Sequence, residues 1–324
     1  MRSRQGLLVC ALATVALLCQ GAGAPPDLLK VKMGNLAFPS LISIILAVIK
    51  DQGLDRKNGL DLEIHPFSAP SAQLAAQATG ETDAGPNGPL ILHRMRLEGA
   101  PLQAVTTLAT LSAMVVITAN PQIKSIQDLR GKTLAADVGS AEFQILATYA
   151  RHKGLDLQRD ATVVVATPPL ARTQLAARRA DAAMTWEPAA TLTMRDSADY
   201  RVIFNGGTGW REITGEDGWE LVISMREDVA RRNPQAVTRL VETLQDAQRF
   251  ITTNLDDADR IVARSANLPP GVLKEAVQAG RVVYDVRGSW APGVRDSLWN
   301  MFKAAVGGGY LKAMPDPRVI YTPN

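Results

Sequence analysis

Gly139, Ser140 and Glu142 stand where a short apolar stretch, Thr133–Ala136, gives way to a predicted helix that begins at Ser140 and ends near His152. A serine at such a position accepts hydrogen bonds from the N–H groups of the first turn, and an adjacent glycine allows a ligand to approach the backbone closely. The free N–H groups and the dipole of a helix N-terminus also attract anions. These residues therefore indicate either an anion-binding helix start or an ordinary N-cap without a ligand.

Other residues able to contact a ligand also precede or begin predicted helices. Trp186 could stack on an apolar part of a ligand or simply close the core. Glu187 could accept a hydrogen bond from an amine or hydroxyl, or be a first-turn glutamate that the helix dipole favours. Since Glu187 would repel a bare anion, a ligand that it faces would be organic and carry a donor. Asn87 can donate and accept but also cap a helix, and Phe38 could wall a pocket or anchor a loop.

The elements that position these residues repeat along the chain. Gly53-Leu54-Asp55 and Gly154-Leu155-Asp156 end corresponding helices, and Asp83-Ala84-Gly85 and Asp181-Ala182-Ala183 begin corresponding strands. The offset of about 100 residues is the size of a whole domain rather than of a solenoid repeat. Strands that alternate with helices predict an α/β fold of two mostly parallel sheets with right-handed crossovers.

The boundaries of the two predicted lobes follow from this repeat. Residues 25–118 and 219–324 would form lobe one with the C-terminal helices, and residues 119–218 would form lobe two. The first strand is expected at 28–33 with a loop at 34–39. Residues 205–218 are expected to be a polar surface loop, in which Trp210 and Arg211 either cover the cleft or are solvated. The expected C-terminal helices span residues 234–253, 255–265, 271–279 and 293–305.

A cleft between the lobes is the predicted binding site, because ligands of open α/β sheets lie at the carboxyl ends of the strands. Two lobes joined by crossings near residues 118–121 and 217–220 would close over a ligand by a hinge. Loops at the strand ends supply the candidate ligand-binding residues, which are Asn35, Leu36, Phe38, Ser68, Ala69, Asn87, Gly139, Ser140, Ala141, Glu142, Trp186 and Glu187.

The N-terminus has the composition of a secretory signal peptide. Basic Arg2 and Arg4 precede an apolar stretch over residues 6–18, and small residues follow up to position 24. The segment is too short to span a membrane. Cys19 leaves a lipoprotein anchor open, although Leu18 before it is larger than such sites usually have. We expect a secreted, periplasmic protein.

Composition narrows the chemistry further. The only two cysteines, Cys10 and Cys19, lie in the leader, so the mature chain has no disulfide, catalytic cysteine or cysteine-bound metal. His65, His93 and His152 lie far apart, so neither a metal nor another cofactor is expected. The 35 basic residues nearly balance the 32 acidic ones and form no run typical of nucleic-acid binding. No catalytic motif appears, and we expect no catalytic residues.

Several short sequence motifs, which occur in a fixed order, resemble those of one family. They are Asp51-Gln52-Gly53-Leu54, Lys57-Asn58-Gly59-Leu60-Asp61-Leu62-Glu63, Gly80-Glu81-Thr82-Asp83-Ala84-Gly85, the run from Ile123 to Lys132, and Asp181-Ala182 followed by Glu187-Pro188. Over nearly the whole mature chain, the sequence resembles the solute-binding proteins of ABC importers in the nitrate, sulfonate and taurine group. The resemblance implies a two-lobed type II periplasmic-binding-protein fold that binds a small anionic organic solute. It also implies delivery of that solute, without chemistry, to a permease and its ATPase. We expect a monomer.

Two alternatives stay open at the level of sequence. The same group includes proteins similar to enzymes of thiamine-pyrimidine-precursor synthesis, but those enzymes carry a cysteine-rich motif that the mature chain lacks. The other alternative is a sensor or scaffold whose cleft is vestigial. Turnover by the purified protein would favour the enzyme, and a response to ligand that persists without Trp186 would favour the scaffold or place Trp186 in the core.

Overall fold

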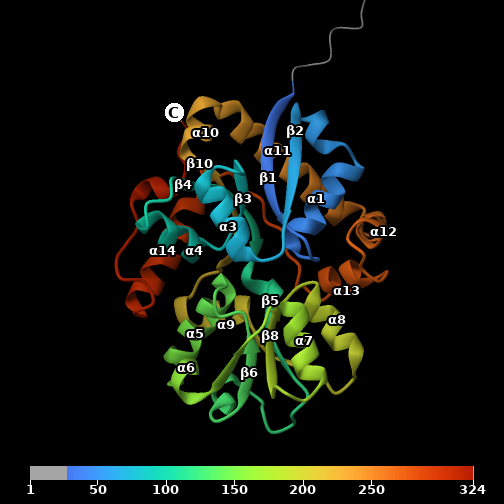
Figure 1. Ribbon diagram of the computed structural model, residues 1–324, viewed down its shortest axis with the longest axis vertical. Helices are drawn as coiled ribbons and strands as arrows, with labels where there is room; N and C mark the ends of the chain where they lie inside the picture. The colour runs from blue at the N-terminus through green and yellow to red at the C-terminus, as the bar shows by residue number, and fades with distance from the viewer. Residues whose placement is uncertain (1–27, 324) are drawn as a thin grey trace, which may run out of the picture.

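Two five-stranded sheets organise residues 28–323, the part of the chain that the computed structural model describes. Each sheet belongs to one α/β lobe, and the lobes lie one above the other along the long axis of the molecule (Figure 1). The predicted signal peptide, with Cys10 and Cys19, lies outside the described residues.

The sheet of lobe one has the strand order β2-β1-β3-β10-β4. Its strands are β1 (Leu29–Leu36), β2 (Leu60–Phe67), β3 (Ala84–Asn87), β4 (Leu102–Thr110) and β10 (Trp219–Arg226). β1 runs parallel to β2 and β3, and its register with β2 extends from Leu29 opposite Leu60 to Leu36 opposite Phe67. β10 is antiparallel to both of its neighbours, β3 and β4.

The sheet of lobe two repeats this plan with the order β7-β6-β8-β5-β9. Its strands are β5 (Met114–Thr118), β6 (Thr133–Ala136), β7 (Thr162–Val165), β8 (Ala182–Trp186) and β9 (Arg201–Asn205). β6 runs parallel to β7 and β8, whereas β5 is antiparallel to β8 and β9. Each sheet therefore has a parallel part, as predicted, and one antiparallel strand in the fourth position.

These antiparallel strands mark where the chain changes lobes. Residues 114–118 were assigned to lobe one from the sequence, but β5 hydrogen-bonds to β8 and β9 in the second sheet. The first crossing therefore lies at the short 3-10 helix η1 (Leu111–Ala113) and not at residues 118–121. The return crossing lies between β9 and β10, and β10 rejoins the first sheet as expected.

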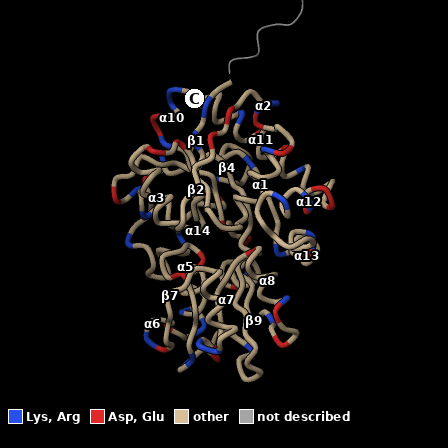
Figure 2. The backbone as a smooth tube through the Cα atoms, turned by 45° about the vertical axis from the view of Figure 1, so that its right-hand side comes forward, with Lys and Arg blue, Asp and Glu red and all other residues tan. Residues whose placement is uncertain are grey.

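Helices flank both sheets. Lobe one contains α1 (Leu41–Asp51), α2 (Leu54–Lys57), α3 (Pro70–Thr79) and α4 (Pro89–Leu97), and lobe two contains α5 (Ala141–His152), α6 (Leu157–Asp160), α7 (Pro168–Ala176), α8 (Ala189–Asp196) and α9 (Gly206–Thr214). The C-terminal helices are α10 (Glu227–Arg232), α11 (Pro234–Thr253), α12 (Leu255–Ser265), α13 (Val272–Gln278) and α14 (Val294–Gly307), and short 3-10 turns occur at η2 (Ile126–Leu129) and η3 (Pro317–Val319). Basic and acidic residues are interspersed along the outer helices (Figure 2).

Two local predictions were wrong. β1 continues to Leu36, where a loop was expected from residue 34, because its pairing with β2 extends that far. The stretch 205–218, expected to be a surface loop, contains helix α9, whose N-cap Asn205 accepts a hydrogen bond from the Thr208 N–H at 3.1 Å. Trp210 on this helix is only 1% exposed and packs in the core, so it is not a solvated loop residue.

The hydrophobic cores show where the two lobes pack against each other. α1 is apolar on nearly every side, and its isoleucines and leucines are buried against the first sheet and the helices α11 and α12. A second cluster of buried residues runs through both lobes and includes Leu102 of β4, Met114 of β5, Phe143 of α5 and Phe302 of α14. This continuous apolar packing holds the strand ends of the two lobes against each other on the side of α4, α5 and α14.

We expect substitution of Leu46 by alanine to lower the free energy of unfolding by about 2–5 kcal/mol, because it empties a fully enclosed site in the core of lobe one. Leu46 is 1% exposed, whereas Leu97 at the end of α4 is 53% exposed. Leu97→Ala is the matched control and should change stability by less than about 0.5 kcal/mol. Chemical denaturation of both variants measures this, and equal effects would contradict the described burial of α1.

Candidate ligand-binding site

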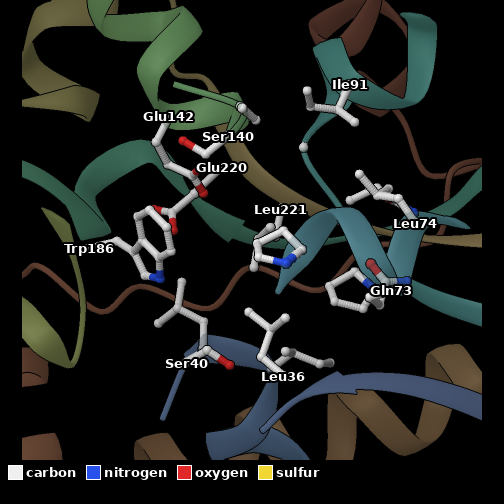
Figure 3. Close-up of a pocket in the computed structure, with 18 residues that line it drawn as sticks. Leu36, Ser40, Gln73, Leu74, Ile91, Ser140, Glu142, Trp186, Glu220 and Leu221 are labelled. Carbon is white, nitrogen blue, oxygen red and sulfur yellow. The ribbon is translucent and has the colours of Figure 1, made fainter. Parts of the chain in front are cut away.

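A cavity lies between the two lobes. Lobe one contributes the end of β1, the beginnings of α1, α3 and α4, and the neighbouring strands β3 and β10. Lobe two contributes the beginning of α5 and the end of β8. We call this space the interlobe cavity. It is lined by Leu36, Ser40, Leu41, Ile42, Pro70, Gln73, Leu74, Pro86, Asn87, Gly88, Ile91, Gly139, Ser140, Ala141, Glu142, Trp186, Glu220 and Leu221 (Figure 3).

The start of α5 satisfies much of its own hydrogen bonding. Ser140 caps the helix, because its hydroxyl oxygen accepts from the Phe143 N–H at 3.2 Å and its O–H donates to the Asp137 carbonyl at 2.8 Å. The Gly139 N–H donates to the Asp137 carboxylate at 3.1 Å. The carboxyl of Glu142 lies in the first turn, where the helix dipole favours a negative charge. Two acidic side chains of the protein itself, those of Asp137 and Glu142, therefore already lie at this helix start.

Two buried carboxyl groups meet in the interlobe cavity. Glu142 and Glu220 are 7% and 2% exposed, and Figure 3 shows their side chains side by side next to the indole of Trp186. Burial raises the pKa of Glu142 to about 7, although the helix N–H and the Ser140 hydroxyl oppose the shift. Burial, and then the charge of Glu142, raise the pKa of Glu220 well above its usual value. Without a ligand, the cavity therefore favours neutral carboxyl groups.

Two oxygen atoms in the cavity wall lack a hydrogen-bond partner. They are Oε2 of Glu220 and Oδ1 of Asn87, and each residue is 2% exposed. The amide nitrogen of Asn87 is engaged, since it donates to the Ser224 hydroxyl at 2.5 Å and to Oε1 of Gln77 at 2.9 Å. Leaving buried polar atoms unpaired costs about 1–3 kcal/mol each, so these oxygens mark a place where a hydrogen-bonding partner is missing.

The rest of the cavity wall is largely apolar. Leucines and isoleucines from α1, α3, α4 and β10 surround the acidic end, and Trp186 presents its indole beside the two glutamates. None of the residues that line the interlobe cavity is a lysine, arginine or histidine. The wall therefore offers apolar contacts, an aromatic face and hydrogen-bond acceptors, but no cationic side chain for a bare anion.

Seven of the residues predicted as ligand contacts lie in this wall, namely Leu36, Asn87, Gly139, Ser140, Ala141, Glu142 and Trp186. Asn35 and Phe38 instead line a separate hollow beside α1, and Ser68 and Ala69 lie outside the interlobe cavity at the turn before α3. The sequence had no argument for Ser40, Gln73 or Glu220. Of these, Glu220 carried the clearest signal, because it is an acidic residue within the otherwise apolar and aromatic start of β10.

Glu187 does not face the interlobe cavity. Its carboxylate is fully buried and accepts hydrogen bonds from Nε of Arg281 at 2.5 Å and from the Thr191 hydroxyl at 3.0 Å. Arg281 follows α13, which packs on α12 of lobe one, so the pair joins the C-terminal helices to lobe two. Glu187 is therefore not placed to accept from a ligand amine, as considered from the sequence, and the acidic residues that line the cavity are Glu142 and Glu220.

Other features concern the described residues as a whole. Between residues 28 and 323, no group of three or more histidine, cysteine, aspartate or glutamate side chains is placed to hold a metal ion. In the same part of the chain, no helix has both the length and the apolar composition that a membrane span needs.

Two α/β lobes of equal plan, joined by crossing segments around a cavity at their strand ends, define a two-lobed periplasmic-binding-protein fold. The chain belongs to the NMT1/THI5-like family, whose pattern it matches over residues 41–258. A protein of Brucella abortus (strain 2308), named as a candidate binding protein, is 24% identical over 314 residues, which cover 95% of each chain.

Solved structures show the same fold. The periplasmic aliphatic sulphonate binding protein of Escherichia coli superposes with a TM-score of 0.74 at 21% identity and covers 92% of this chain and 93% of its own. The alkanesulfonate-binding protein of Xanthomonas axonopodis pv. citri, bound to MOPS, gives a TM-score of 0.71 at 20% identity, with 92% and 98% covered. The expected fold is therefore confirmed.

Removing Arg281 should destabilise the protein by about 3 kcal/mol, because Arg281→Ala leaves the buried carboxylate of Glu187 without its charged partner. The control is Arg260→Ala. Arg260 and its partner Asp257 lie on the surface of α12, and their side chains are 64% and 53% exposed, respectively. That change should cost less than about 1 kcal/mol. Thermal and chemical denaturation give both values, and equal losses would show that Arg281 does not compensate a buried charge.

Replacing Glu142 by glutamine should raise stability more at about pH 8 than at about pH 5. The folded protein holds the proton of Glu142 up to a pKa of about 7, whereas the unfolded chain releases it near the ordinary value of 4.5. The stability that the neutral carboxyl contributes is therefore complete below the unfolded pKa and lost as pH rises through 7, a loss of about 3 kcal/mol. Melting temperatures of wild type, Glu142→Gln and the surface control Glu98→Gln at both pH values test this. A difference that is larger at pH 5 would contradict it.

Proposed function

We propose that this protein is the solute-binding component of an ABC importer. It works in the periplasm, holds a small organic solute between its lobes, and delivers the solute unaltered to a membrane permease driven by an ATPase. The observation that carries the proposal is the interlobe cavity, because strand ends and helix starts of both lobes line one shared cavity. The family match and the naming of the relatives as binding proteins support it.

Contact between the lobes gives this receptor a means of enclosing its solute. A Cβ atom built on Gly88, at the start of α4, would lie 2.0 Å from Cβ of Ala141, at the start of α5. The lobes can therefore meet here only because residue 88 has no side chain. The φ angle of Gly88 is −67°, which any residue adopts, so its requirement for glycine is steric. We propose that the lobes separate at this contact, by rotation about the crossings at η1 and before β10, to admit the solute.

Binding without catalysis fits the groups at the cavity wall. The two hydroxyls, of Ser40 and Ser140, both cap helices, and no histidine or lysine lies in the wall to activate them. The names of the neighbours from Escherichia coli and Xanthomonas make sulfonates the first compounds to test, in line with the anionic organic solute expected from the sequence.

A panel of sulfonates, carboxylates, pyrimidines and amines at millimolar concentration should contain compounds that raise the melting temperature of the protein. A ligand at about 100 times its Kd adds about 2.7 kcal/mol to the stability of a protein that binds it only when folded. Gly88→Ala should abolish this response by blocking closure, and its melting temperature without ligand checks that the variant is folded. Gly307→Ala is the control, because a Cβ at the end of α14 would meet nothing within 4 Å.

Two results would contradict the proposal. One is the absence of any shift across the whole panel. The other is conversion of a bound compound into a product, detected by mass spectrometry after incubation with the purified protein, which would favour an enzyme on this fold.

A further inference from the structure

The acidic end of the interlobe cavity is incomplete as the protein stands alone. Oε2 of Glu220 and Oδ1 of Asn87 are buried, unpaired acceptors from two neighbouring strands, β10 and β3. Both residues line the cavity, and Glu142 adds a second carboxyl from the opposite lobe. Two unpaired acceptors from lobe one, next to a carboxyl group from lobe two, indicate that a donor arrives with the solute.

Resting on the proposed function, we propose that the solute carries a protonated amine nitrogen, which Glu220 and Glu142 hold against the indole of Trp186. An ammonium group has up to three donors and no acceptor, so it matches a wall that offers acceptors. A cation over the face of a tryptophan gains further electrostatic attraction, and Figure 3 places the indole next to both carboxyl groups. The apolar remainder of the wall suits a short carbon skeleton attached to the amine.

An anionic group is a poor occupant of the same position. It would meet two carboxyl groups and no cationic side chain in the wall. Two N–H groups at the start of α5 are also already engaged, since Asp137 accepts from the Gly139 N–H and Ser140 accepts from the Phe143 N–H. If the solute also has a sulfonate or carboxylate, that group lies away from Glu220 and Glu142, and the amine distinguishes the solute from simple anions.

Binding of the amine should release a proton from the carboxyl groups of Glu142 and Glu220. Burial keeps the pKa of both glutamates raised in the empty protein, and an adjacent ammonium group lowers it. The charged and titratable groups around them do not supply that cation. Glu187, already paired, and Tyr284 face Glu220, while Asp137 faces Glu142. Affinity for an amine should therefore rise with pH through about 7, whereas affinity for an anion should fall.

The test uses two matched pairs of compounds and titration calorimetry on the mature protein. Taurine differs from isethionate only by an ammonium group in place of a hydroxyl, and cyclohexylammonium differs from cyclohexanol in the same way. The amine of at least one pair should bind about tenfold or more tightly than its alcohol, as expected for charge-assisted hydrogen bonds. This preference should grow from about pH 6 to about pH 8.

Two variants connect the preference to the carboxyl groups. Glu220→Gln keeps the size of the side chain but removes its charge, and should reduce the preference for the amine about tenfold. Glu98→Gln, on the exposed end of α4, should leave it unchanged. The melting temperature of each variant without ligand checks that it is folded.

The inference is overturned if the alcohols bind as tightly as the amines, or if Glu220→Gln folds and keeps the full preference for the amine. It is also overturned if none of the four compounds binds while the wider panel yields a solute without a basic nitrogen. In these cases the receptor function stands. If neither the panel nor the four compounds bind, both the inference and the proposed function fail.

Discussion

The carboxyl group of Glu220 lies in an apolar cavity, where one of its oxygens meets no donor. A buried polar group without a partner costs free energy, and Glu142 beside it makes ionisation of either group harder. Such an arrangement persists only if the rest of the fold stabilises it. Here that stability comes from two large apolar clusters, one inside lobe one and one shared by both lobes. The cavity therefore contains buried hydrogen-bonding groups that are available to a ligand.

In the proposed receptor, solute binding and the relative position of the lobes would be coupled through the same few contacts. Glu220 enters from β10, the strand that returns to lobe one, while Glu142 belongs to lobe two. Next to them the lobes touch at Gly88, and at the other side Arg281 joins the C-terminal helices to Glu187 of lobe two. A solute that bridges the two glutamates would favour the closed arrangement by its differential affinity for it.

The periodicity of the sequence predicted much of the fold, but the sequence predicted only some of the residues that line the cavity. The bounds of α11 and α12 agree with prediction because their apolar faces repeat clearly along the sequence. The helix α9 was missed because its glycines resemble a flexible loop, whereas a Cβ at Gly209 would lie 2.2 Å from the ring of Phe204. Glu220 stands out in the sequence as an acidic residue in the otherwise apolar and aromatic start of β10, but its place in the cavity depends on Asn87 and Glu142, which only the tertiary fold brings to it.

Nuclear magnetic resonance of protein labelled with 13C at the glutamate carboxyls tests the central claim most directly, with Glu220→Gln and Glu142→Gln to assign the two signals. At about pH 6.5, the account predicts that Glu220 is protonated in the free protein and becomes ionised when a bound amine such as taurine or cyclohexylammonium is added. A Glu220 carboxyl that is ionised in the free protein, or that stays protonated with the amine bound, would contradict it.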